Sequence, residues 1–217
     1  MQLVTVLGLI GMAVVAAGAA GCRSAVRDQG APIVQPGPPG ESSRILTPEA
    51  VARLEPPSHT TEDVRFMQGM IAHHAQALEM TGLLKTRTAS DAMRKLAQRI
   101  EVSQADEIEM MRQWLESRGA DGPAEHAHHA PGAPLMPGML TPEQMQRLAA
   151  ARGPDFDKLF LEYMIRHHEG ALVMVKQLFA TPGGGQESDI HAFASDVDAD
   201  QRMEIGRMVG MLKELEK

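Results

Sequence analysis

Two stretches of the chain decide its fold, and they share one pattern. Residues 66–74 read FMQGMIAHH and residues 160–168 read FLEYMIRHH, so the second histidine pair follows the first at an offset of 167 − 73 = 94 positions. Further along, residues 104–111 read QADEIEMM and residues 201–208 read QRMEIGRM. These matches predict an internal repeat whose unit carries Met-x-x-His-His and then Gln-x-x-Glu-Ile.

The residues around both motifs have the periodicity of amphipathic helices. Apolar positions recur at intervals of three and four residues over about 60–85, and again over about 90–119. A proline-capped short helix is expected over about 141–151, and two more long helices over about 154–180 and from about 187 onward. No segment predicts a strand. The expected fold is therefore all-α, a four-helix bundle made of two duplicated αα-hairpins.

The N-terminal part has the composition of a targeting segment. Residues 3–20 form an apolar run that ends in small residues before Cys22, which resembles a bacterial lipoprotein signal with lipid on Cys22. Ala19 stands where leucine is usual and no Lys or Arg precedes the run, so cleavage near Ala19 and an uncleaved anchor stay open. All three interpretations place the protein in the cell envelope, outside the cytoplasm. Lipid or an uncleaved segment would anchor it to the membrane at its periplasmic or extracellular face.

Composition changes along the chain predict its domain organisation. The signal would cover residues 1–21, and a tether rich in Pro and Gly, which cannot bury a core, would cover 22–59. The helical-bundle domain would cover 60–217. Its parts would be repeat 1 at 60–119, a linker at 120–153 and repeat 2 at 154–217.

Overall composition excludes several kinds of function. The net charge of −7 argues against a nucleic-acid partner, because phosphate binding needs a basic surface. A single cysteine excludes an internal disulfide framework and cysteine-based zinc or iron–sulfur sites. The 16 methionines, beside 5 Phe, 1 Trp and 1 Tyr, indicate a core filled by flexible thioethers, which are also soft metal ligands.

Histidines and methionines at the same helical phase are the candidate metal ligands. Each motif places a methionine three and four residues before two histidines, on the same side of a helix. His74 and His168 are expected near the centre of the apolar face, and His73 and His167 at its margin. Thioether and imidazole together favour Cu(I) and Ag(I), so copper is the expected ion. The predicted ligands are His73, His74, His167, His168, Met70, Met80, Met164 and Met174.

Acidic residues on the apolar faces leave a structural alternative open. Asp63, Asp157, Glu107 and Glu204 would be costly to bury alone, so each would serve either as a hydrogen-bond partner of a core histidine or as a metal ligand. A di-iron site of the ferritin type needs a histidine three residues after a glutamate. Met110 and Arg207 occupy those positions after Glu107 and Glu204. No nucleophile elbow or phosphate loop is present, so no catalytic residue is assigned and an enzyme is not favoured.

The linker carries a further group of metal-ligand side chains. It is interpreted either as a second copper-collecting tract or as a solvated, variable loop. The residues concerned are His126, His128, His129, Met136 and Met139.

The motifs resemble the bacterial family known as domain of unknown function 305. The resemblance covers roughly residues 60–217 and rests on the doubled Met-x-x-His-His blocks and on Met-Pro-Gly-Met at 136–139. It implies a ferritin-like bundle, and copper or silver binding through Met and His in envelope proteins tied to copper tolerance. It implies no settled enzymatic activity.

The expected function is thus an envelope-anchored copper-binding or copper-buffering protein. A metal-dependent oxidase and a metal-free interaction module are the alternatives. A homo-oligomer and a copper-delivery partner both remain open.

Overall fold

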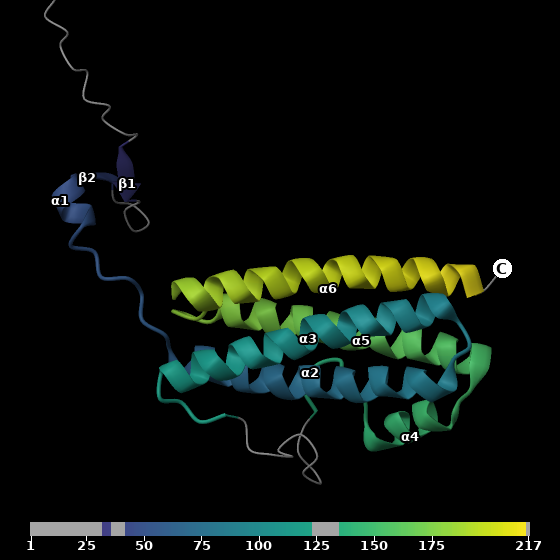
Figure 1. The fold of residues 1–217 in the computed structure, drawn as a ribbon. Coiled ribbons are helices and arrows are strands. Elements are labelled where there is room, and N and C mark those ends of the chain that lie inside the picture. Colours follow the sequence, from purple (N-terminus) through teal and green to yellow (C-terminus); the bar gives the residue numbers. More distant parts are fainter. Residues whose placement is uncertain (1–31, 36–41, 123–134, 216–217) are drawn as a thin grey trace, which may run out of the picture. The chain divides into compact units, whose positions relative to one another are not determined.

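The computed structural model describes residues 32–35, 42–122 and 135–215, which fall into two compact units, Met1–Leu54 and Glu55–Lys217 (Figure 1). In the first unit, β1 (Ile33–Gln35) pairs antiparallel with β2 (Arg44–Leu46), and α1 (Pro48–Val51) follows. The strand pair corrects the expectation that the chain has no strand. Its β-branched residues suit extended backbone, a signal that the surrounding Pro and Gly residues obscured.

The second unit is a bundle of four long helices. They are α2 (Thr61–Arg87), α3 (Asp91–Ser117), α5 (Gly153–Ala180) and α6 (Ser188–Leu215), with the short α4 (Pro142–Ala150) between the hairpins. α2 packs against α3, α5 packs against α6, and α2 and α5 join the two hairpins (Figure 1). The predicted helical bundle is confirmed. Within the described ranges, no helix has the length and apolar character needed to cross a membrane.

Side-chain caps explain where the helices begin. Thr60 and Asp63 form a reciprocal capping box at the start of α2, and Thr141 does the same with Gln144 at α4. Ser90 caps α3 by accepting a hydrogen bond from the backbone N–H of Met93. Each such cap stabilises its helix by about 1 kcal/mol. The observed boundaries lie within a few residues of those predicted from periodicity.

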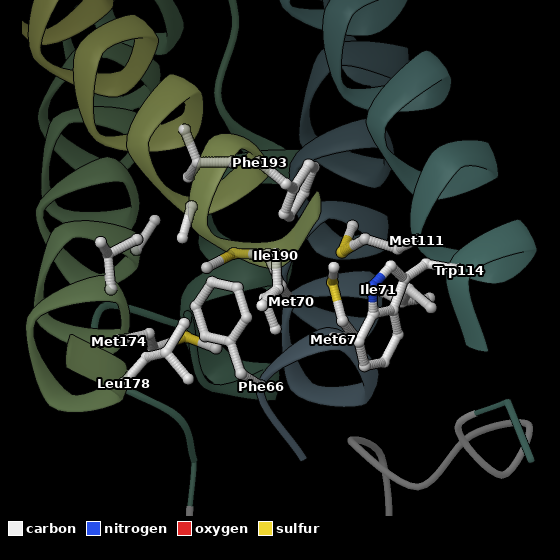
Figure 2. Close-up of a cluster of buried hydrophobic side chains, with 14 of the residues drawn as sticks. Phe66, Met67, Met70, Ile71, Met111, Trp114, Met174, Leu178, Ile190 and Phe193 are labelled. Carbon is white, nitrogen blue, oxygen red and sulfur yellow. The ribbon is translucent and has the colours of Figure 1, made fainter. Parts of the chain in front are cut away.

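The core of the bundle consists of two apolar clusters, and each long helix contributes to both. The first cluster, shown in Figure 2, includes Phe66, Met70, Trp114, Met174 and Phe193. The second contains, among others, residues from 77–84 and 156–164, at the opposite end of the bundle. The N-terminal half of α2 packs in the first cluster and its C-terminal half in the second. The order is reversed for α5, so the two helices run antiparallel. Between the clusters, all four helices present polar side chains to the interior.

Candidate metal centre in the middle of the bundle

A layer of buried polar residues separates the two apolar clusters. We call it the histidine layer, and each member is at most 2% exposed. Such a layer is costly in a small core unless its polar groups are satisfied. Its members are His73, His74, Gln104, His167, His168 and Gln201.

His73 and His167 lie at the centre of this layer. Both are 0% exposed, which corrects the expectation that they sit at the margin of the apolar face. Adjacent side chains on a helix point about 100° apart. α2 packs against both α3 and α5, and α5 packs against both α2 and α6, so both histidines of each pair point into the bundle. The His73 and His167 ring centroids are 3.8 Å apart, whereas consecutive rings on one helix are 6.3 and 6.4 Å apart. The helices carrying the two histidine pairs thus pack together, as predicted.

The outer histidines are each held by a glutamate from the neighbouring helix. His74 Nε2 lies 2.5 Å from Glu107 Oε2, and His168 Nε2 lies 2.6 Å from Glu204 Oε2. An ionised carboxylate only accepts hydrogen bonds, so Nε2 carries a proton, and in the neutral form of the ring Nδ1 is the nitrogen with the lone pair. Neither Nδ1 atom has a hydrogen-bond partner among the described residues. Carboxylates often orient metal-binding imidazoles in this way.

The inner histidines also present lone pairs without partners. His73 Nε2 donates to the backbone oxygen of Pro137 at 3.0 Å, which again leaves Nδ1 as the unprotonated nitrogen. In the part of the chain that the structure describes, His73 Nδ1 and both ring nitrogens of His167 are buried without a partner. The Gln104 amide is in the same position. Buried polar atoms of this kind cost roughly 1–3 kcal/mol each when left unpaired, so the layer is chemically suited to an additional ligand.

Burial keeps the inner imidazoles uncharged. It lowers the pKa of His73 to about 3, and the repulsion between His73 and His74 that would arise if both were protonated makes a smaller contribution. Burial also lowers the pKa of His167 well below its usual value, and His73 and His168 lower it further. Both rings are therefore neutral at physiological pH. A metal ion binding to them has no proton to displace.

The predicted thioether ligands flank the histidine layer from both sides. Met70 and Met174 belong to the first apolar cluster, and Met80 and Met164 belong to the second. Three are completely buried and Met174 is 8% exposed. Within the described ranges, no three His, Cys, Asp or Glu side chains are grouped so that they could hold an ion. The methionines lie in the apolar clusters that adjoin the layer on its two sides.

The aspartates of the two motifs do not partner the core histidines. Asp63 Oδ2 accepts from the Thr60 N–H and Oδ1 accepts from the Gly185 N–H, each at 2.7 Å. This corrects the expectation that Asp63 partners a core histidine. His74, on the same helical face, is eleven positions further along α2, a rise of roughly 16 Å. Asp157 is 5% exposed, and its Oδ1 has no hydrogen-bond partner among the residues described.

Residues 136–140 form a strap over α2 and α5, a role that the sequence alone did not show. The Gln76 side chain accepts from the Leu140 N–H at 2.7 Å and donates to the Leu140 oxygen at 2.9 Å. On α5, Gly170 leaves room for the strap, because a Cβ there would lie 2.0 Å from the Pro137 oxygen. When the two repeats are aligned, Gly170 of the second repeat occupies the position of Gln76 in the first. This difference between the repeats is the signal in the sequence that points to the strap.

The strap also changes the interpretation of the linker methionines. Met139 is 6% exposed and Met136 packs against the first apolar cluster, so this end of the linker is not a solvated loop. The predicted ligands His126, His128 and His129 lie outside the described residues, as does Cys22.

Substituting Gly170→Ala should displace the strap. The new methyl group would meet backbone atoms of Pro137 and Gly138, which have little freedom to move. We expect the free energy of unfolding to fall by about 1–3 kcal/mol, measured by urea denaturation. Gly82→Ala, also in a long helix but with nothing within 4 Å, is the matched control and should be neutral or stabilising. Equal losses in both variants would contradict the strap's role.

Comparison with known proteins places the chain in a family. The model of a domain of unknown function, DUF305, matches residues 63–212. A DUF305 protein from Streptomyces coelicolor, inferred to be secreted, aligns with 28% identity and a TM-score of 0.62 over 71% of this chain and 92% of its own. A DUF305 fragment from Deinococcus radiodurans has 29% identity and a TM-score of 0.62, covering 73% and 99%.

A third similar structure is that of CopM in a Cu(II)-bound form. It has 25% identity and a TM-score of 0.59, and it covers 70% of this chain and 96% of CopM. None of the curated proteins compared with the chain matches it. Since the family model matches more than half of the sequence, the chain belongs to the DUF305 family.

Proposed function

We propose that the histidine layer binds Cu(I) or Ag(I), and that the protein buffers copper in the cell envelope. One observation carries the proposal: hydrogen bonds to Pro137, Glu107 and Glu204 occupy Nε2 of His73, His74 and His168, and the buried Nδ1 of each ring has no partner among the described residues. A neutral imidazole with a fixed tautomer is a prepared metal ligand.

The charges around the layer suit a monovalent cation. An ion on Nδ1 of His74 or His168 would be separated from Glu107 or Glu204 by the imidazole ring and one hydrogen bond, and these carboxylates would offset part of the cost of burying positive charge. The surrounding ligands are neutral and soft, and methionines of both apolar clusters border the layer. This combination favours Cu(I) and Ag(I) over hard divalent cations.

The family comparison supports the same ion. CopM has been solved with Cu(II), Cu(I) and silver, and it has the same helical-bundle fold. The direct test is an anaerobic Cu(I) titration against a competing chelator, with the full chain carrying Cys22→Ala so that its thiol does not bind the ion. Tight, saturable binding is expected. Failure to compete with the chelator would refute the proposal.

We also propose that lipid on Cys22 anchors the protein to the membrane. The basis is the apolar run before Cys22 and the similarity to a DUF305 protein inferred to be secreted. Replacing Cys22 by Ala should block processing or release the protein from the membrane fraction, because no helix of the described residues could span a membrane. Fractionation and gel mobility measure this. Unchanged membrane retention and mobility would indicate an uncleaved anchor instead.

A further inference from the structure

A small surface pocket lies at the beginning of the strap, outside the histidine layer. Its volume is about 220 Å³, and its lining includes Met136, Met174, Phe66, Gly69 and Pro137. Figure 2 shows Met174 beside Leu178 and Phe66 in the first apolar cluster. Met136 is half-buried and Met174, a member of the first apolar cluster, is 8% exposed, so the pocket is lined by one partly exposed and one largely buried thioether.

The side chains of Met136 and Met174 approach the same residue of α2, Gly69. A Cβ on Gly69 would lie 3.3 Å from Met136 Sδ and 3.4 Å from Met174 Cε. Because Gly69 has no side chain, both methionines approach the α2 backbone at this position. Methionine has three rotatable bonds, so both sulfurs are able to turn toward an ion in the pocket at little energetic cost.

From this arrangement we propose a second soft-metal site, in which Met136 and Met174 bind Cu(I) or Ag(I) at the surface and pass it to His73. Thioethers are neutral and do not titrate, so the site should be weaker than the histidine layer, selective for soft ions and insensitive to pH. Glu62 and Arg65 also line the pocket and form an ion pair with each other, so the two thioethers are the donors on which the proposal rests.

The strap provides the route from this site to the buried histidines. Met136 directly precedes Pro137, whose backbone oxygen accepts the hydrogen bond from His73 Nε2 at 3.0 Å. An ion held by Met136 is therefore one residue away from the group that covers the inner histidine. The transfer step rests on the function proposed above, whereas binding at the methionine pair does not.

The binding test uses Ag(I) and the full chain carrying Cys22→Ala, His73→Leu and His167→Leu, with methyl-labelled methionine. Titration should shift the NMR methyl signals of Met136 and Met174, equally at pH 5 and pH 7. Adding Met136→Leu with Met174→Leu, which conserves side-chain volume, should abolish this binding. Met110→Leu with Met203→Leu, at methionines that are 53% and 67% exposed, is the matched control and should leave it intact. Unshifted Met136 and Met174 signals would overturn the site whether or not the histidine layer binds metal.

A second variant tests the geometry, and a rate measurement tests the transfer. Gly69→Ala places a methyl group between the two thioethers and should weaken Ag(I) binding, whereas Gly82→Ala in the same helix should not. With the histidine layer intact, the single variant Met136→Leu, which keeps Met174, should fill the layer at least about tenfold more slowly while its final affinity stays unchanged. Equal filling rates in the two proteins would refute the transfer step.

Discussion

Replacing His167 by Leu should abolish tight Cu(I) binding and leave the fold intact. Both ring nitrogens of His167 are buried, and neither has a partner in the described part of the chain. A leucine of similar size removes these polar atoms, so the metal-free protein should keep its stability or gain some. Loss of an oriented carboxylate partner of a ligand costs about 10–100-fold in metal affinity, so loss of the ligand itself should cost more than about 100-fold.

The comparison needs a histidine that lies outside the layer. His59 lies against Trp114, with ring centroids 5.6 Å apart, and His59→Leu should not change the affinity. Chelator competition measures the affinity of each variant, and circular dichroism with urea unfolding checks its fold. If His167→Leu is folded and binds Cu(I) as tightly as the unmodified chain, His167 is not a ligand. If it unfolds, the histidine is structural.

Lowering the pH should destabilise the metal-free bundle below about pH 6.5. Burial lowers the pKa of His73 to about 3 in the folded protein, whereas the unfolded chain has the ordinary value of 6.5. Between these values the unfolded state binds a proton that the folded state does not, so the free energy of unfolding falls as the pH falls. From pH 7 to pH 4 the loss from His73 alone is about 3 kcal/mol. His167, whose pKa is also lowered by burial, adds to it.

Urea denaturation at several pH values measures this effect. The variant His73→Leu should flatten the pH dependence, since leucine does not titrate. Loading the protein with Ag(I) should protect it from acid, because the ion binds the neutral imidazoles of the folded state. A stability that stays constant from pH 7 to pH 4 in the metal-free protein would contradict the burial of neutral histidines.

Helical periodicity and the paired motifs were sufficient to predict the bundle and the proximity of the two histidine pairs. The boundaries of α2, α3, α5 and α6 follow from local signals, which are caps and apolar spacing. The sequence also indicated Glu107 and Glu204 as histidine partners, because a carboxylate on an apolar face needs one. It left open whether these glutamates were ligands instead.

Other features depend on tertiary packing, which a single helix cannot show. Predicting the burial of His73 and His167 requires knowing that α2 packs against other helices on two of its faces. Likewise, Asp63 and His74 share a helical face, but the helical rise between them prevents the contact that a shared face predicts. The strap depends on contacts between Gln76 and Leu140, 64 positions apart in the chain. Such long-range pairing leaves little trace in local periodicity.

The most direct test of the proposed centre is to observe the histidine nitrogens while metal binds. Nitrogen-15 NMR of the full chain carrying Cys22→Ala, titrated with Ag(I), distinguishes the two nitrogens of each ring. We predict that the Nδ1 signals of His73, His74 and His168 shift on binding, while their Nε2 atoms stay protonated. Shifts confined to His126, His128 and His129, with the signals of the histidine layer unchanged, would contradict the assignment of the metal centre to the core of the bundle.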